Sequence, residues 1–139
     1  MALLPGELRE LIESGPLTHL STINPDGSPQ VTVIWIGLDG DAIVSGHIAH
    51  RRKLQNIERD PRVVLSFDAP RDHKVVRNPY AVIRAHASVE PSDGAWDLLN
   101  RLTKTYMSPD DEFPAPRGAG YIVRYEVERI GGVGPWAGV

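Results

Sequence analysis

The chain has 139 residues, with 15 Lys and Arg against 18 Asp and Glu, and therefore a formal net charge of −3 at pH 7. This length predicts a single domain, 1–139, with a modest core and no room for separate cofactor and substrate domains. The acidic balance argues against a nucleic-acid-binding protein, which normally carries a basic excess. Cysteine is absent, which excludes disulfides, Cys-ligated metals and a thiol nucleophile.

The N-terminal segment MALLPGELRELIESG places acidic residues early and has only a short apolar start. It lacks the basic region and the long apolar run of a signal peptide. No stretch approaches the roughly 20 apolar residues that a membrane helix needs. We therefore expect a soluble cytoplasmic protein that binds neither a membrane nor nucleic acid.

The spacing of Leu4, Leu8, Leu11 and Ile12 predicts a short amphipathic helix.

Apolar runs bounded by Gly, Pro, Asn and Asp predict six strands with short helices between them. The expected strands are 17–23, 30–38, 42–45, 63–67, 80–89 and 121–130, with helices over 50–58 and from 91–93 onward, and loops at 69–78 and 107–119. Turn signals at 24–27 and 39–40 favour hairpins. The pattern predicts a mostly β fold, a small antiparallel barrel rather than a doubly wound sheet.

Strand 30–38 is apolar on both faces. Alternation places Val31, Val33 and Trp35 on one face and Thr32, Ile34 and Ile36 on the other. One face would fill the barrel, and the other needs cover from a helix of the same chain or from a second subunit. Such a strand in a chain this small predicts a homodimer.

The segment 41–67, DAIVSGHIAHRRKLQNIERDPRVVLSF, contains the strongest candidate for a ligand site. Its first strand ends near Ser45, and Arg51, Arg52 and Lys53 follow at the start of the next helix. Arginine and lysine suit a phosphate, and cations at a helix start oppose the helix dipole unless an anion or solvent compensates them. A phosphate site is one interpretation. A solvated basic turn, balanced by the acidic residues that follow, is the other.

Two histidines, His47 and His50, lie beside these cations, three residues apart, and are expected to share a helix face. No further ligand lies at a metal-site spacing, so no metal is expected. Each histidine is open to three interpretations: a surface residue, a cofactor contact, or a proton donor near a cofactor.

Two further segments have both a simple and a functional interpretation. Asn78-Pro79-Tyr80 is either a turn that starts a strand or a rim that packs an aromatic ring against a planar ligand. The glycine-rich tail opens no helix, so it is not a dinucleotide motif. Its Trp136 docks on the barrel or on a partner subunit, or the tail is a frayed end. No Ser/His/Asp set, paired carboxylates or Walker loop is present, and no catalytic residue is identified.

Four stretches carry a family resemblance: THLSTINPDGSPQVTVIW, then Lys53-x-x-Asn56-x-x-x-x-Pro61-Arg62-Val63, then NPYAVIRAHASVE and YIVRYEVERIGGVGPW. In order and spacing they resemble the pyridoxamine-phosphate-oxidase-like split-barrel flavoproteins. The resemblance is closest to the group B oxidoreductases that depend on coenzyme F-420, a deazaflavin. It implies a six-stranded antiparallel split barrel of the FMN-binding type, and a homodimer with cofactor sites at the subunit interface.

The resemblance also implies roles for individual residues. Arg52 and Lys53, with Arg51, would bind the cofactor phosphate, with Ser45 and His47 nearby; Thr32, Val33, Ile34 and Trp35 would line the ring and ribityl side; and Asn78, Pro79, Tyr80 and Trp136 are weaker candidates for walls, from either subunit. Thr32 stands where the true oxidases place an arginine on the flavin phosphate, and their C-terminal substrate-phosphate residues have no counterpart in GGVGPWAGV. These departures argue against pyridoxine phosphate oxidation and favour F-420 over FMN.

The expected function is therefore hydride transfer from reduced F-420 to a small organic substrate, such as an activated double bond or a quinone. The cofactor performs such chemistry, which agrees with the lack of protein acid–base pairs. The proton that follows would come from solvent, His47, His50 or Tyr80. An FMN-dependent flavoprotein and a non-enzymatic flavin-binding or F-420-binding protein are the alternatives.

Overall fold

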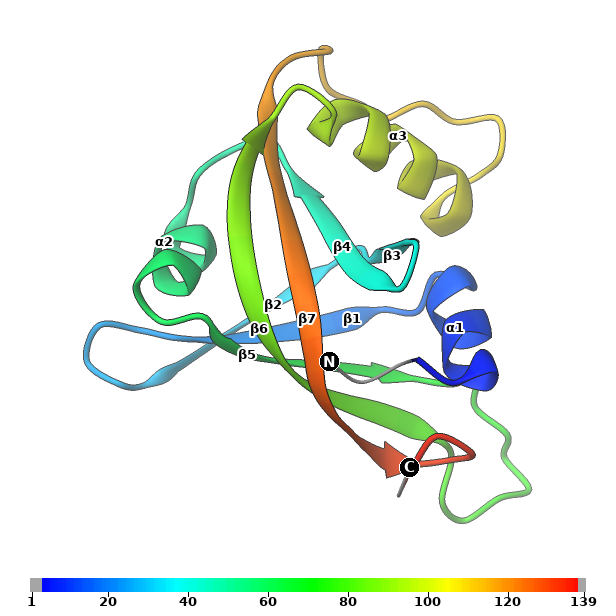
Figure 1. Ribbon diagram of the computed structural model, residues 1–139. Helices are drawn as coiled ribbons and strands as arrows, with labels where there is room; N and C mark the ends of the chain where they lie inside the picture. Colours follow the sequence, from blue (N-terminus) through cyan, green and yellow to red (C-terminus); the bar gives the residue numbers. More distant parts are fainter. Residues whose placement is uncertain (1–3, 138–139) are drawn as a thin grey trace.

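The computed structural model describes residues 4–137, which form three helices and seven strands. In chain order these are α1 Gly6–Glu13, β1 Thr18–Ile23, β2 Pro29–Ile34, β3 Gly37–Asp39, β4 Ala42–His47, α2 Arg52–Arg59, β5 Arg62–Asp68, β6 Tyr80–Ser92, α3 Ala95–Tyr106 and β7 Gly120–Val133. All strands join one antiparallel sheet in the order β2-β1-β5-β6-β7-β4-β3 (Figure 1). The prediction of a mostly β fold with short helices is confirmed.

The predicted six-stranded barrel is wrong in two respects: the sheet has seven strands and it is not closed. The expected strand 30–38 divides into β2, which pairs with β1, and β3, which pairs with β4 at the opposite edge. Between them the N–H of Ile36 donates to the hydroxyl of Tyr106 at 3.1 Å. At Gly37 a Cβ would lie 2.8 Å from Leu102 Cδ2, so a glycine there allows α3 to approach closely.

The main core lies on the inner side of the curved sheet, where α1 and α2 pack. Leu54 and Ile57 of α2 are 0% and 2% exposed, as their spacing predicts, and each such side chain contributes about 1.5–3 kcal/mol by burial. A second, smaller cluster forms between α3 and the other side of β4 and β7, around Val44, Leu98 and Leu102. Figure 1 shows α2 and α3 on opposite sides of the long β6–β7 ribbon.

The outward face of β2 is only partly covered by the chain itself. Trp35 stacks on Tyr106 of α3, with ring centroids 5.2 Å apart. Val31 and Val33 remain 59% and 53% exposed. The expected intramolecular cover is therefore present at one end of this face and absent along β2.

The C-terminal tail packs against the sheet, as one interpretation of the sequence predicts. Trp136 is 3% exposed and its indole N–H donates to the carbonyl of Tyr80 at 3.1 Å. This packing places the tail at the start of β6. In the part of the chain that the structure describes, no helix has both the length and the apolar character required to cross a membrane.

Candidate functional site

The β4–α2 segment, residues 45–53, carries the cations to the start of a helix. Arg51 is the extended residue before α2, Arg52 is the first helical residue, and both are exposed. No side chain caps this end, and its first turn contains no acidic residue. The free N–H groups, the helix dipole and the cations all favour an anion here. The predicted cation cluster at a helix start is confirmed.

Lys53 differs from its two neighbours because it is half-buried. Its pKa is lowered, first by burial and then by the positive charge of Arg51. Both causes disfavour the charged ammonium group, and the attraction of a nearby anion would offset them. Lys53 and the uncapped helix end therefore both favour a bound anion.

Ser45 and His47 lie on the inner face of β4, next to this helix end. Ser45 Oγ lies 2.7 Å from His47 Nε2 and 2.8 Å from the hydroxyl of Tyr125 on β7. Burial, reinforced by the charge of Lys53, lowers the pKa of His47 to about 4, so the imidazole is neutral at pH 7. Burial also raises the pKa of the Tyr125 phenol. Ser45 is fully buried, and no hydrogen bond joins it to the cations among the described residues.

Gly46, between Ser45 and His47, allows the outer side of β4 to pack closely against α3. At Gly46 a Cβ would lie 2.9 Å from Leu99 Cγ and 3.2 Å from the carbonyl oxygen of Ala95. Its missing side chain therefore allows α3 to approach β4 while the inner face holds the buried polar groups.

His50 has a different environment from His47. Its Nε2 lies 2.6 Å from Glu58 Oε1, and its ring lies 5.2 Å from that of Tyr121. The two histidines do not share a helix face as predicted, because His47 ends β4 and α2 begins only at Arg52. Within residues 4–137, no cluster of three or more His, Asp or Glu has the geometry of a metal site.

The predicted ring-side residues on β2 and after it fall into three environments. Ile34 is buried in the core, Val33 faces outward, and Trp35 is occupied by the rings of Tyr106 and Phe113. Thr32 stands apart because its Oγ1 is buried without a hydrogen-bond partner among the described residues. Such orphaned hydroxyls are uncommon in folded proteins and call for a partner.

The structure does not bring Asn78, Pro79 and Tyr80 to the cation cluster within one chain. Tyr80 pairs with Val133 at one end of the β6–β7 ribbon, whereas His47 is next to Tyr121 at the other end. The Asn78 side chain braces its own loop: it accepts from the N–H of residue 72 at 2.6 Å and donates to the carbonyl of residue 75 at 3.3 Å. Its contribution to a site with the cations would require a second subunit.

Two important residues lack a direct signal in the sequence. Tyr125 is indistinguishable from any other inward residue of an alternating strand. Asn56 is 1% exposed and anchors α2 to the β1–β2 hairpin, because its Nδ2 lies 3.1 Å from Thr22 Oγ1 and 3.0 Å from Asn24 Oδ1. A polar residue between Leu54 and Ile57 on the inner face of a short helix is the one hint that the sequence offers.

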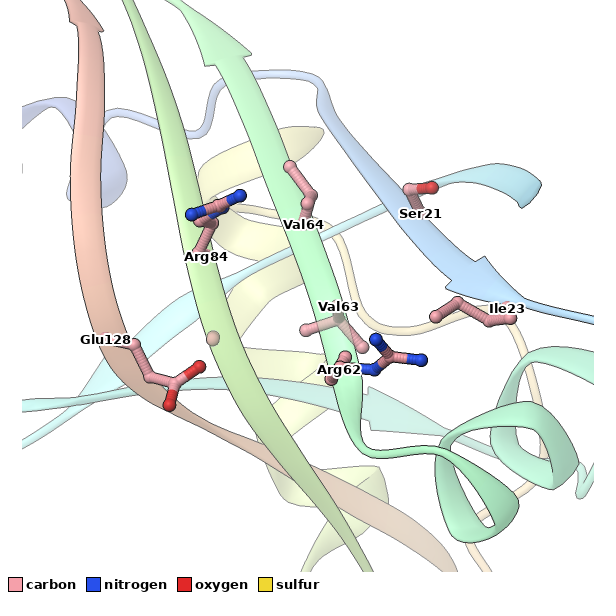
Figure 2. A pocket seen from close by; sticks show the side chains of 8 residues that line it. Ser21, Ile23, Arg62, Val63, Val64, Arg84 and Glu128 are labelled. Atoms are coloured by element: carbon pink, nitrogen blue, oxygen red, sulfur yellow. The ribbon is translucent and has the colours of Figure 1, made fainter. Parts of the chain in front are cut away.

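A groove of about 370 Å³ runs over the outer side of the sheet. It is lined by Ser21 and Ile23 of β1, Arg62, Val63 and Val64 of β5, Arg84 and Ala85 of β6, and Glu128 of β7. Figure 2 shows Arg84 between Val64 and Glu128, with Arg62 near Ile23. Arg51, Arg52 and Lys53 are not among the residues that line this groove. In a single chain, Arg51 and Arg52 are exposed and Lys53 is half-buried.

Comparisons with known proteins agree with this architecture. The family described as pyridoxamine 5'-phosphate oxidase matches residues 4–133. An F-420 reductase structure is similar, with a TM-score of 0.72 and 27% identity over 92% of this chain and 98% of that one. A conserved hypothetical protein from Mycobacterium tuberculosis has a TM-score of 0.74 at 20% identity, covering 94% of this chain and 84% of its own.

The heme storage protein HutZ from Vibrio cholerae is also similar, with a TM-score of 0.65 at 16% identity over 94% of this chain and 95% of that one. At such identities the last two likenesses concern the fold alone. No curated protein sequence matches the chain.

Proposed function

Because the chain belongs to the pyridoxamine 5'-phosphate oxidase family, whose fold is that of flavin-binding oxidoreductases, we propose that it is an oxidoreductase dependent on coenzyme F-420. The proposed reaction transfers a hydride from the reduced deazaflavin to a small organic substrate such as an activated double bond or a quinone. The similar F-420 reductase structure supports this choice of cofactor. The family supports a flavin as the competing choice.

The observation that carries the proposal is the uncapped start of α2. Arg51, Arg52 and Lys53 lie at this helix start, where no side chain caps the backbone N–H groups and the first turn has no acidic residue, an arrangement that fits a phosphate group. Thr32 is a weaker candidate for a second polar contact, because its hydroxyl has no partner among the described residues but is itself buried. These features are compatible with the phosphate and the polar chain of a flavin-like cofactor.

We propose that the complete site lies between two copies of this chain. The surface formed by the outward side chains of β1 and β2, here called the hairpin face, comprises His19, Ser21, Ile23, Val31 and Val33. Its two valines are more than half exposed, and a symmetric dimer would bury them. Because Arg51 and Arg52 are exposed in a single chain, a second subunit would also supply a wall for the cation cluster.

A bound deazaflavin supplies the hydride, so the protein contributes binding, orientation and electrostatics. Arg52 and Lys53 would hold the phosphate, and residues 32–35 would lie along the cofactor. The low pKa of His47 argues against this residue as the general acid at neutral pH. The proton that follows the hydride would then come from solvent or from another group.

The test is a titration of the purified protein with F-420 and with FMN, followed by absorbance. We expect saturable binding with a preference for F-420. Replacing both Arg52 and Lys53 with Ala should weaken binding at least about 10-fold, because a hydrogen bond to a charged group contributes about 1.5–3 kcal/mol. Lys104→Ala, which removes an exposed cation on α3, should leave the affinity unchanged.

Three outcomes would contradict the proposal in different ways. Unchanged affinity in the double variant would overturn the phosphate assignment. A preference for FMN would replace the cofactor and make the protein an FMN-dependent flavoprotein. Tight F-420 binding without turnover of a panel of enones and quinones would indicate a carrier instead of an enzyme.

A further inference from the structure

Three buried polar side chains form a hydrogen-bonded chain that ends next to the proposed phosphate site. Tyr125 on β7 is bonded to Ser45 on β4, which is bonded to His47 on the same strand, at 2.8 and 2.7 Å. The three residues are 1%, 0% and 8% exposed. The hydroxyl hydrogens of Tyr125 and Ser45 must therefore be satisfied within the chain itself.

Counting the hydrogens decides the direction of this chain. The Tyr125 hydroxyl has one partner among the described residues, Ser45 Oγ, so its hydrogen has one available acceptor. Ser45 then accepts from Tyr125 and donates its own hydrogen to His47 Nε2. The reverse direction would bury the phenolic hydrogen without an acceptor, which costs about 1–3 kcal/mol.

This direction fixes the state of the imidazole. An Nε2 that accepts a hydrogen bond carries no proton, so a neutral His47 must carry its proton on Nδ1. Nδ1 has no hydrogen-bond partner within residues 4–137, and it is not among the buried atoms without a partner. It therefore reaches the surface of the molecule.

His47 itself is close to the start of α2. The chain leaves His47 and enters α2 after residues 48–51, and the charge of Lys53 is near enough to act on the imidazole. A neutral N–H at this position donates a hydrogen bond to an anion without adding a fourth positive charge to the cluster.

We propose that Tyr125 and Ser45 hold His47 in its Nδ1–H tautomer, and that this N–H donates to an anionic oxygen bound at the start of α2. Tyr125 and Ser45 are then positioning residues that act through His47. The first half of this inference depends only on the buried chain. The second half rests on the proposed phosphate site.

The first half is tested by two-bond 1H–15N correlation spectra of the cofactor-free, 15N-labelled protein near pH 7.5. We expect His47 to show a protonated Nδ1 and an unprotonated Nε2. Tyr125→Phe keeps the shape of the side chain but removes the donor to Ser45, and should give a mixture of tautomers. Ser45→Ala, which interrupts the chain, provides a second variant and should do the same. Loss of the signal in His47→Asn assigns it, and the other histidines serve as internal controls.

A protonated Nε2 in the unmodified protein, or an unchanged tautomer in both variants, would overturn the first half. Neither outcome would depend on any bound cofactor. A role limited to packing would not alter the tautomer, so the spectra distinguish positioning from simple stabilisation.

The second half is tested by adding inorganic phosphate to the same labelled protein. The His47 Nδ1 signal should shift along the same binding curve as the amide signals of Arg52 and Lys53. His47→Ala should weaken phosphate binding about 10-fold, as expected for the loss of one charged hydrogen bond. His47→Asn, whose amide offers a donor near the Nδ1 position, should retain most of the affinity, and the matched control His50→Ala should retain all of it.

Phosphate that shifts the α2 amides and leaves His47 unchanged would overturn the donor role alone. Phosphate that shifts neither would overturn the donor role together with the phosphate site, while the tautomer measurement would stand by itself. The two proposals therefore fail in distinguishable ways.

Discussion

The β4–α2 segment and the hairpin face both contribute to the proposed site, but the chain satisfies their side chains in opposite ways. In the β4–α2 segment, Ser45 and His47 are bonded to each other and to Tyr125 inside the protein. On β2, Val31 and Val33 are more than half exposed, and neighbouring Thr32 has a buried hydroxyl without a described partner. The buried hydroxyls of the first region are satisfied within one chain, whereas the apolar side chains of the second are left uncovered by it.

The largest effect is expected when a charge is placed on the hairpin face. Val33→Asp should weaken the proposed dimer at least about 100-fold, because each copy would bury an unpaired carboxylate and two-fold symmetry doubles the cost. Sedimentation velocity over a concentration series measures the change. Val76→Asp, at a loop residue that is 99% exposed, is the matched control and should leave the dimer unchanged. An intact Val33→Asp dimer would show that the subunits meet through another surface.

The β4–α2 segment should make the stability of the protein depend on pH. The pKa of His47 falls from 6.5 to about 4 on folding, mainly through burial, so the unfolded chain binds more protons between these values. The contribution of His47 to the free energy of unfolding should therefore decrease as pH falls from about 6.5 to about 4, by up to about 3 kcal/mol, and then level off. Urea unfolding at several pH values measures this loss.

The His47→Asn variant isolates this contribution, because it should lose less stability than the unmodified protein between pH 6.5 and pH 4. The matched control His73→Asn, in an exposed loop, should follow the unmodified protein throughout. Equal slopes for all three proteins would mean that His47 does not titrate differently in the folded and unfolded states.

Asn56 lies on the helix that follows the β4–α2 segment and contacts the β1–β2 hairpin, which carries the hairpin face on its other side. Its side-chain amide joins α2 to Thr22 and Asn24 of the β1–β2 hairpin. Asn56→Ala leaves these buried partners without their donor and should lower the free energy of unfolding by about 1–3 kcal/mol. Gln55→Ala, at an exposed position of the same helix, should change it by less than about 0.5 kcal/mol. Equal changes in chemical denaturation would show that Asn56 is not an anchor.

The sequence predicts features that depend on neighbouring residues, but not those that depend on contacts between residues far apart in the chain. Local patterns predict most strands, the loop 69–78, and the cations at the start of α2, because spacing and turn residues act over short distances. The break in strand 30–38 is not predictable in this way, since it depends on the hydroxyl of Tyr106, 70 residues further along the chain. The Ser45–Tyr125 bond, between residues 80 apart, is equally hidden, because both residues fit ordinary alternating strands.

For the candidate site, the sequence likewise identifies residues but not the properties that the folded surroundings give them. The sequence identifies His47 and Thr32 as candidates by resemblance, but not the reason that each is distinctive. A neutral tautomer and an orphaned hydroxyl are properties of the folded surroundings, which no spacing rule contains. Conversely, the resemblance implies that Asn78, Pro79 and Tyr80 form walls of the cofactor site. In this chain they lie at the end of the β6–β7 ribbon that is away from the cation cluster, so their role remains a prediction about the dimer.

The smallest effect, and the one that separates a structural role from a ligand role, is expected at Thr32. Thr32→Val keeps the side-chain shape and removes a buried hydroxyl that has no described partner, so the cofactor-free protein should become more stable by up to about 1 kcal/mol. The matched variant Thr22→Val, on the paired strand, removes a hydroxyl bonded to Asn56 and Gln30 and should destabilise by about 1–3 kcal/mol. Thermal unfolding without cofactor compares the two. If the Thr32 hydroxyl contacts the cofactor, Thr32→Val should also weaken cofactor binding while it strengthens the fold. A loss of stability in the cofactor-free protein would instead mean that this hydroxyl already has a partner within the folded protein.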